Sequence, residues 1–207
     1  MSHSLLKFTL ALFVATAMGC SASTPNAEPI NPPPVVPEGM ESAVLGAGCF
    51  WCVEAFYERL DGVEDAVSGY AGGMTVNPDY KQVSHGLTDH AEVVMVIYDP
   101  KVITYRELID FFWTTHDVTD GRGVWPDFGP QYRSTLLYMN ESQKAAIEAS
   151  RKEYEAETGK TVATVIAPLG EFYTAETYHQ DFAEKNPNHG YIQQILVPKL
   201  KKLGMSL

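Results

Sequence analysis

The apolar segment over residues 91–98 constrains the fold of this chain more than any other feature of the sequence. Apart from Glu92 its residues are almost all apolar, and Val and Ile dominate. A short run of this composition predicts a β-strand that is buried on both faces. Asp99-Pro100 follows directly and ends the predicted strand. We therefore expect a sheet that is covered on both sides at this strand.

Residues 40–207 are predicted to form one domain in which strands and helices alternate. Hydrophobic residues make up 45% of the 207-residue chain, which is enough to bury one compact core. Apolar residues at helical spacing predict helices over residues 49–60, 105–115 and 142–157, with short helical segments over 176–184 and 191–203. Further strands are expected over residues 42–47, 63–70, 134–139 and 161–167. Because no Rossmann glycine pattern accompanies this alternation, we expect an α+β fold, a two-layer α/β sandwich with a mixed, ferredoxin-like sheet.

The first 19 residues are predicted to be a signal peptide. Lys7 precedes an apolar run over residues 8–18, which is shorter than the roughly 20 residues that span a bilayer and is typical of a secretory signal. The run ends at Ala17-Met18-Gly19-Cys20, which resembles a bacterial lipobox except that Leu is usual at the position of Ala17. We expect Cys20 to be a lipid anchor; the alternative is an ordinary cleaved signal with a free Cys20.

Residues 20–39 are predicted to be a Pro-rich linker. Six of the 13 prolines lie within residues 21–39, a composition typical of an extended tether rather than a packed segment. The domain is therefore expected to be exported to the periplasm as a lipoprotein that touches the membrane only through its N-terminal lipid. Ser21, rather than Asp, after Cys20 favours the outer membrane.

The composition of the chain also excludes several classes of partner and of structural support. Fifteen Lys and Arg stand against 26 Asp and Glu, so a chain with a net charge of -11 has no general attraction for nucleic acid. Three cysteines are too few for a disulfide scaffold. The histidines of the domain show no paired metal-ligand spacing, so we expect no metal and no cofactor. A monomer is expected.

The segment Gly48-Cys49-Phe50-Trp51-Cys52 is the candidate reactive site. Cys49 follows a predicted strand and opens a predicted helix, where the helix dipole and free N–H groups lower the pKa of a thiol. Gly48 allows a sharp turn before it. Phe50 and Trp51 at a helix start do not both point into the core, so at least one is expected to face a ligand. On these residues alone, a buried cysteine that packs as a small hydrophobe remains the commoner case.

Gly48-Cys49-Phe50-Trp51 resembles the signature of the A-type peptide methionine sulfoxide reductases, which repair one sulfoxide epimer. Further motifs that fit this family, in order along the chain, are Asp61-Gly62-Val63, Ser68-Gly69-Tyr70-Ala71-Gly72-Gly73, His90-Ala91-Glu92-Val93, Asp127 with Gly129, Gln131-Tyr132-Arg133-Ser134, Phe172-Tyr173, Ala175-Glu176 and Tyr178-His179-Gln180. Together they cover most of residues 43–187. The resemblance implies an enzyme that reduces the S epimer of methionine sulfoxide, free or in proteins, with residues 40–207 as its catalytic domain.

This reaction needs a nucleophile, an acid and hydrogen-bond donors, because thiolate attack on the sulfoxide sulfur is helped when the oxygen gains a proton. Cys49 is the expected nucleophile. Glu92 is the expected acid, because burial beside an apolar strand raises the pKa of a carboxyl and keeps it neutral. An exposed strand-end carboxylate is the general alternative for Glu92, and the resemblance favours the acid.

The resemblance also implies the remaining parts of the pocket. Tyr80 and Tyr132 are expected to donate phenolic hydrogen bonds to the sulfoxide oxygen, with Asp127 completing the polar side. Phe50 and Trp51 are expected to form an apolar wall for the S-methyl group, where contact between sulfur and an aromatic ring is favourable.

The sulfenic acid left on Cys49 must be resolved before another turnover. Many relatives use a cysteine near the C-terminus, but residues 199–207 contain none, and Cys52 stands where relatives commonly have glycine. Residues three apart are neighbours on a helix, so the two sulfurs can meet if the first turn loosens. We expect a Cys49–Cys52 disulfide that a thioredoxin-like partner reduces. The alternative is a packed Cys52 with direct reduction of Cys49 by an external thiol.

Three other functions fit the sequence less well. A thioredoxin-type dithiol–disulfide exchanger also uses Cys-x-x-Cys after a strand, but usually with small residues or proline between the cysteines rather than Phe-Trp. A zinc site would need two more soft ligands. A non-catalytic binding lipoprotein would explain the tether but would leave Cys49 and Glu92 without a role.

Overall fold

The computed structural model describes residues 31–207. The expected signal peptide and Cys20 lie outside these residues. No helix of the described part of the chain has the length and apolar composition needed to cross a membrane.

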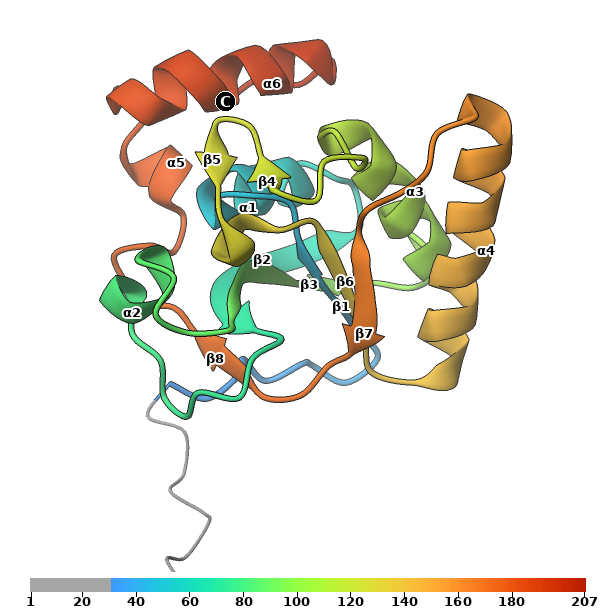
Figure 1. Cartoon of the computed structure of the whole chain (residues 1–207), viewed down its shortest axis with the longest axis horizontal. Helices are drawn as coiled ribbons and strands as arrows, with labels where there is room; N and C mark the ends of the chain where they lie inside the picture. The colour runs from blue at the N-terminus through green and yellow to red at the C-terminus, as the bar shows by residue number, and fades with distance from the viewer. Residues whose placement is uncertain (1–30) are drawn as a thin grey trace, which may run out of the picture.

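One six-stranded sheet forms the centre of the domain (Figure 1). Its strands are β1 (Glu41–Gly46), β2 (Val63–Ala71), β3 (Ala91–Tyr98), β6 (Thr135–Tyr138), β7 (Val165–Pro168) and β8 (Phe172–Thr174). They lie in the order β7-β6-β1-β3-β2-β8. Only β6 and β7 pair in parallel; all other neighbours are antiparallel, so the sheet is mixed as predicted.

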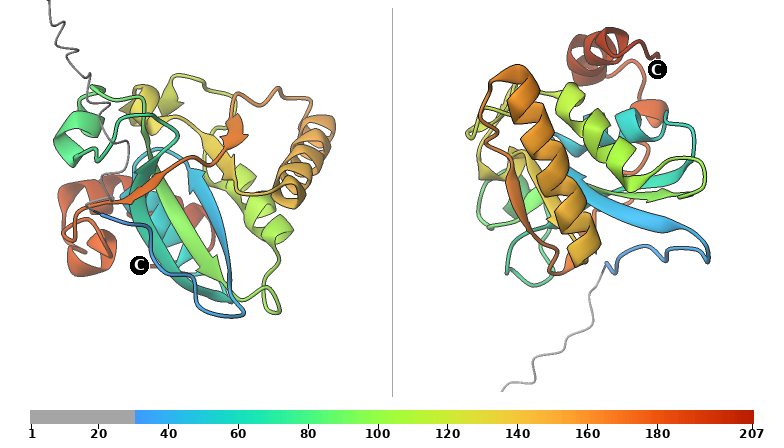
Figure 2. Two further views of the ribbon diagram at one scale, coloured as in Figure 1. Left: turned by 90° about the horizontal axis from the view of Figure 1, so that it is seen from below. Right: turned by 90° about the vertical axis from the view of Figure 1, so that its right-hand side faces the viewer.

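Two crossover helices connect the inner strands. The helices of the domain are α1 (Phe50–Tyr57), α2 (Tyr80–Ser84), α3 (Tyr105–Thr115), α4 (Glu141–Thr158), α5 (Phe182–Lys185) and α6 (Val197–Lys202), the last preceded by a π-helical turn at Ile192–Leu196. Helix α1 leads from β1 to β2, and α3 leads from β3 to β6, which gives a β-α-β-β-α-β chain order. Helix α4 lies beside α3 (Figure 2). The mixed α/β character of the prediction is confirmed.

Strand β3 occupies the predicted residues, and all eight are buried. Val94 and Val96 pack into the main core beneath α1 and α3. Val93 and Met95 point to the opposite face of the sheet and join a smaller cluster that includes Phe172 of β8. Because successive side chains of a strand alternate between faces, apolar clusters on both sides require the continuous apolar run.

Other predicted boundaries were partly wrong. Helix α3 matches its prediction, but α1 ends at Tyr57 rather than at residue 60, and β7 begins only at Val165. No sequence pattern predicted α2, β8, or the hairpin formed by β4 (Gly123–Val124) and β5 (Asp127–Phe128). These elements span two to five residues, which is too short for a hydrophobic period to show.

The end of the Pro-rich linker contacts the domain. The backbone N–H of Thr174 donates to the Asn31 carbonyl at 3.1 Å, and its Oγ1 donates to the Pro32 carbonyl at 2.6 Å. Both residues are exposed but hydrogen-bonded to β8, and the extended tether itself stays a prediction. Proline lacks an N–H but keeps its carbonyl, so this segment can accept hydrogen bonds from the free donors of the edge strand β8.

Candidate active site

A glycine turn places Cys49 at the start of α1. Gly48 has φ +86°, and a Cβ atom there would lie 2.9 Å from Cβ of Val124 in the β4–β5 hairpin. Cys49 follows as the N-cap residue. Both the backbone conformation and the contact with the hairpin therefore require glycine before the cysteine.

The Cys49 thiol is buried, with 9% of the residue exposed. Burial raises its pKa well above the ordinary value, and the neighbouring charge of Glu92 raises it further. The Trp51 backbone N–H at the start of α1 lowers the pKa, but its effect is the smaller one. The prediction of a lowered pKa is therefore wrong for the substrate-free protein, because desolvation outweighs the helix N-terminus.

Glu92 lies at the same end of α1 as Cys49. It is 1% exposed, and its Oε2 accepts a hydrogen bond from the Phe50 backbone N–H at 3.1 Å. Burial raises the pKa of Glu92 to about 8, although the bond from Phe50 lowers it. The carboxyl is thus mostly neutral at pH 7. It is held by the backbone of Phe50, the residue that directly follows the nucleophile, as the predicted acid requires.

Tyr80, Tyr132 and Asp127 converge on this point from three separate segments: α2, the 3-10 turn Pro130–Tyr132 and β5. Burial, and next the charge of Glu92, raise the pKa of Tyr80 to about 12 and also raise that of Tyr132. The charges of Cys49 and Asp127 act on both phenols in the same direction. Both hydroxyls therefore keep their protons at neutral pH and are available as donors.

Phe50 and Trp51 differ in burial, although both rings contact the ring of His179, with centroids 4.9 Å and 5.8 Å away. Phe50 is buried, with its ring 6.4 Å from that of Tyr80. Trp51 is only partly buried and stacks on Phe182 with 3.7 Å between ring centroids and 7° between planes. Its Nε1–H donates to Nδ1 of His179 at 3.0 Å. Trp51 is therefore the less buried of the two aromatic side chains at the helix start, although it also packs against the main core.

Two polar residues near the C-terminus hold these groups, although the sequence assigned them no catalytic role. Oε1 of Glu176 accepts from the Tyr80 backbone N–H at 2.9 Å, and its Oε2 accepts from the Tyr70 hydroxyl at 2.7 Å. His179 accepts the Trp51 bond, and burial lowers its pKa to about 4, so its ring is neutral. Both residues stand in motifs that carry the family resemblance, which is the signal that points to them.

Cys52 lies one helical turn beyond Cys49. It is fully buried, and both thiols are free in this structure. Its S–H donates to the Tyr191 hydroxyl at 4.0 Å, and the Tyr191 hydroxyl in turn donates to Oδ2 of Asp127. Tyr191 was not predicted as a site residue, because a single tyrosine in a C-terminal helix carries no distinguishing sequence signal.

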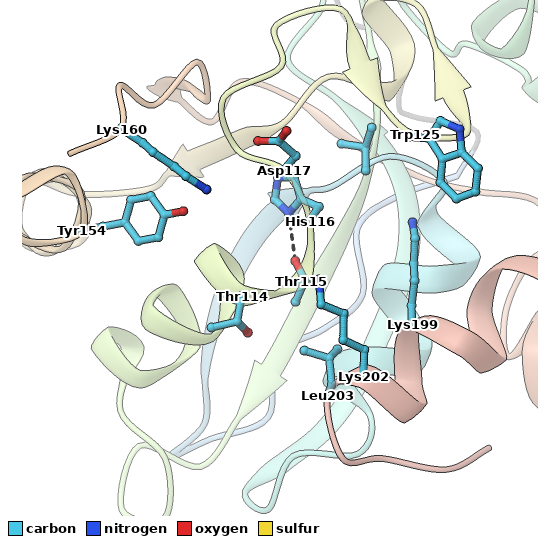
Figure 3. Close-up of a pocket in the computed structure, with 11 residues that line it drawn as sticks. Thr114, Thr115, His116, Asp117, Trp125, Tyr154, Lys160, Lys199, Lys202 and Leu203 are labelled. Carbon is cyan, nitrogen blue, oxygen red and sulfur yellow. Dashed lines mark hydrogen bonds between the residues drawn. The ribbon is translucent and has the colours of Figure 1, made fainter. Parts of the chain in front are cut away.

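A separate, cationic pocket of about 480 Å³ is lined by residues of α3, α6 and the β4–β5 hairpin (Figure 3). It lies between the C-terminal end of α3, the β4–β5 hairpin and α6, and does not include Cys49. Lys160, Lys199 and Lys202 line it, and none of them forms an ion pair within the described chain. The charge of Lys199 lowers the pKa of both Cys52 and Asp127, which ties the pocket electrostatically to the thiol.

No group of three His, Cys, Asp or Glu side chains within residues 31–207 is arranged to hold a metal ion. The candidate nucleophile, acid, phenols and aromatic residues are instead brought together by contacts with one another. Of the predicted site residues, only Cys20 falls outside the described part.

Comparison with known proteins gives consistent matches. The profile of the family described as peptide methionine sulfoxide reductase matches residues 41–206. The peptide methionine sulfoxide reductase MsrA of Sulfolobus acidocaldarius is 47% identical over 163 residues, which cover 79% of this chain and 93% of that protein. Mxr1 from Saccharomyces cerevisiae in reduced form is 40% identical with a TM-score of 0.70, over 74% of this chain and 89% of that one. Mxr1 in complex with Trx2 is 32% identical with a TM-score of 0.51, over 71% and 87% of the two chains.

The family profile begins at β1 and ends beyond α6, so it includes every element that contributes to the site. The two relatives match over 79% and 74% of this chain. This chain belongs to the peptide methionine sulfoxide reductase family.

Proposed function

We propose that this protein reduces the S epimer of methionine sulfoxide, free and in oxidised proteins, to methionine. Cys49 is the nucleophile and Glu92 is the acid. The observation that carries this assignment is the hydrogen bond from the Phe50 N–H to Glu92, which holds a buried, largely neutral carboxyl beside the cysteine. Membership of the family supports the substrate class.

The first step transfers the sulfoxide oxygen to Cys49. As the Cys49 sulfur bonds to the sulfoxide sulfur, Glu92 gives its proton to the oxygen, and the carboxylate that remains takes up the thiol proton. The hydroxyl then passes from the sulfoxide sulfur to the Cys49 sulfur as the bond between the two sulfurs breaks. The substrate sulfur thereby gains two electrons and leaves as methionine, while Cys49 is oxidised to a sulfenic acid. The raised pKa values of both groups suit this exchange, because neither carries a charge before substrate binds.

The surrounding side chains orient the substrate. Tyr80 and Tyr132 donate hydrogen bonds to the sulfoxide oxygen, with Asp127 on the same polar side. Phe50 and Trp51 form the apolar wall for the S-methyl group. Donors on one side and a wall on the other fit only one epimer of a chiral sulfoxide.

Cys52 resolves the sulfenic acid, and a thioredoxin-like protein reduces the resulting disulfide. The position of Cys52 at the third residue after the N-cap supports the pairing. The structure of Mxr1 with Trx2 supports the class of reductant. Dithiol–disulfide exchange as the main activity is not favoured, because the family profile and the relatives match methionine sulfoxide reductases.

Two cysteine variants test this function. With methionine S-sulfoxide and no reductant, the wild type should release one methionine per protein, and Cys49→Ser should release none. Cys52→Ser should still release one methionine but should lose turnover with thioredoxin while keeping turnover with dithiothreitol. Equal activity on the R epimer, or unchanged thioredoxin-dependent turnover of Cys52→Ser, would contradict the assignment.

We also propose that the protein is an exported monomer whose Cys20 carries a lipid that anchors it to the outer membrane. The lipobox-like segment and the Pro-rich linker support this proposal. The strand order β6-β1-β3-β2 supports the ferredoxin-like classification of the core. Labelling of cells with radioactive palmitate, compared between wild type and Cys20→Ser, tests the anchor, and light scattering of the purified domain tests the monomer.

A further inference from the structure

Cys52 must lose its proton before it can resolve the sulfenic acid. It is fully buried in a mostly apolar environment, and burial raises its pKa to about 11. At neutral pH the free thiol is therefore almost entirely protonated, and a protonated thiol is a poor nucleophile. If Cys52 is the resolving residue, as proposed above, the fold has to supply a proton acceptor.

Two consecutive hydrogen bonds lead away from the thiol. The S–H of Cys52 points to the Tyr191 oxygen at 4.0 Å, and the Tyr191 O–H points to Oδ2 of Asp127. Each donor in this line faces the next acceptor, so protons can move in one direction from the sulfur to the carboxylate. Asp127 itself is only partly buried, so it can pass the proton on to solvent.

We propose that Tyr191 and Asp127 form a proton relay that deprotonates Cys52 as it attacks the sulfenic acid on Cys49. Tyr191 acts on the reacting sulfur directly, and Asp127 acts through Tyr191. This role is separate from the substrate-orienting role given to Asp127 in the first step, because methionine has left by then.

The step balances within the protein. The Cys52 sulfur forms a bond to the Cys49 sulfur, and the bond between Cys49 sulfur and its hydroxyl oxygen breaks. The Cys52 proton passes to the Tyr191 oxygen while the Tyr191 proton passes to Asp127. The leaving hydroxyl takes a proton from neutral Glu92 and departs as water. Cys52 is oxidised from thiol to disulfide, and Cys49 is reduced from sulfenic acid to disulfide.

The charges around Cys52 favour this direction. The titratable groups that act on it, from every element packed there, are Lys199 of α6, Tyr191, Asp127 of β5, Glu92 of β3 and Cys49. Lys199 and the Tyr191 hydrogen bond lower the pKa of Cys52, whereas Asp127 and Glu92 raise it. Burial raises the pKa of Asp127 above its ordinary value, which makes it a stronger base, while the Tyr191 hydrogen bond and the charge of Lys199 act in the opposite direction and favour its ionised form.

Tyr191→Phe tests the relay, because it removes only the oxygen that connects the sulfur with the carboxylate. Tyr138→Phe, on β6, is the matched control. Each full-length protein is mixed with saturating methionine S-sulfoxide and no reductant, then quenched at intervals. Released methionine, free thiols and dimedone-trapped sulfenic acid are counted in the same samples.

We expect Tyr191→Phe to release methionine within about threefold of the wild-type rate but to form the disulfide about 10²-fold more slowly at pH 7, with sulfenic acid accumulating. The slow rate should rise with pH towards pH 10, because hydroxide then deprotonates Cys52 directly. Asp127→Asn should also slow the disulfide step relative to methionine release, and the control should match the wild type.

Several outcomes would overturn the relay. One is disulfide formation by Tyr191→Phe at the wild-type rate; another is loss of its methionine burst, which would place Tyr191 in the first step. If the wild type releases methionine but keeps its sulfenic acid, Cys52 does not resolve the sulfenic acid, and the relay has no step to assist. Failure of the proposed function is distinct, because the wild type would then release no methionine.

Discussion

A buried carboxyl at the active site can donate a proton to the substrate, and it also lowers the stability of the fold at neutral pH. Replacement of Glu92 by glutamine separates these two consequences. The amide keeps an oxygen that can accept the Phe50 N–H bond, but it has no proton to give to the sulfoxide. Because the side chain is 1% exposed, the substitution also removes an acid that can ionise freely in the unfolded chain but not in the folded one. We therefore expect Glu92→Gln to lose activity and to gain stability at neutral and alkaline pH.

The size of the stability effect follows from the pKa of Glu92, which rises from 4.5 in the unfolded chain to about 8 in the fold. Below pH 4.5 the carboxyl is neutral in both states, and the wild type bears no penalty. As the pH rises from 4.5 to 8, only the unfolded chain ionises, so the wild type loses stability across this window. The loss amounts to about 3 kcal/mol at pH 7 and about 5 kcal/mol above pH 8, since each pH unit contributes about 1.36 kcal/mol.

Two assays measure these effects. Urea unfolding of both proteins between pH 4.5 and 8.5 gives the difference in their free energies of unfolding. Burial also raises the pKa values of Glu54 and Glu58, to about 8 and about 7. Both proteins contain these two residues, so their contributions to the pH dependence cancel in the difference. Single-turnover release of methionine should be about 10²-fold to 10³-fold slower in Glu92→Gln. The wild-type rate should fall above pH 8 as Glu92 ionises, and the rate of the variant should not.

A variant with the wild-type rate of methionine release would refute the role of Glu92 as the acid. A difference in unfolding free energy that stays constant from pH 4.5 to 8.5 would refute the raised pKa. The two results are independent, so either part of the reasoning can fail alone.

Three further substitutions test how the fold builds the site. Gly48→Ala should destabilise the protein by about 2–4 kcal/mol in urea unfolding and lower activity, because φ is +86° and the new Cβ meets Val124 at 2.9 Å; a loss below about 1 kcal/mol would contradict the steric argument. Trp51→Phe should lower the free energy of unfolding by about 1 kcal/mol in the same assay, because phenylalanine cannot donate the hydrogen bond to His179. An unchanged midpoint would show that this bond contributes nothing to stability. Lys199→Gln should slow disulfide formation severalfold at pH 7 and recover at higher pH, because it raises the pKa of the Cys52 thiol; slowing that does not depend on pH would contradict this cause.

The sequence predicted those parts of the fold whose pattern is long and regular. The apolar run of β3 and the amphipathic period of α3 gave both elements with their observed boundaries. Strand β8 has three residues and is held by pairing with β2, where Gly69 leaves room for the ring of Phe172; a Cβ there would lie 2.3 Å from that ring. A contact between residues so far apart in sequence leaves no local pattern.

The sequence also predicted the residues that are proposed to carry the chemistry, but not all of their properties. Cys49 and Glu92 were identified from their motifs, and the fold places them at one end of α1. The direction of the Cys49 pKa was wrong, because a helix start can be recognised in a sequence whereas the depth of burial cannot. Tyr191 was missed because its role depends on a hydrogen bond to Asp127, 64 residues away.

The amino-acid sequence by itself determined the central strand, the turn before Cys49, the spacing of Cys49 and Cys52, and the family resemblance. Each of these depends on residues that are neighbours along the chain or that recur at a fixed spacing. Only the tertiary structure decided that the thiol is protonated before substrate binds, that Glu92 is neutral, and that Tyr191 links Cys52 to Asp127. These properties depend on desolvation and on contacts between distant segments, which exist only when the chain has packed.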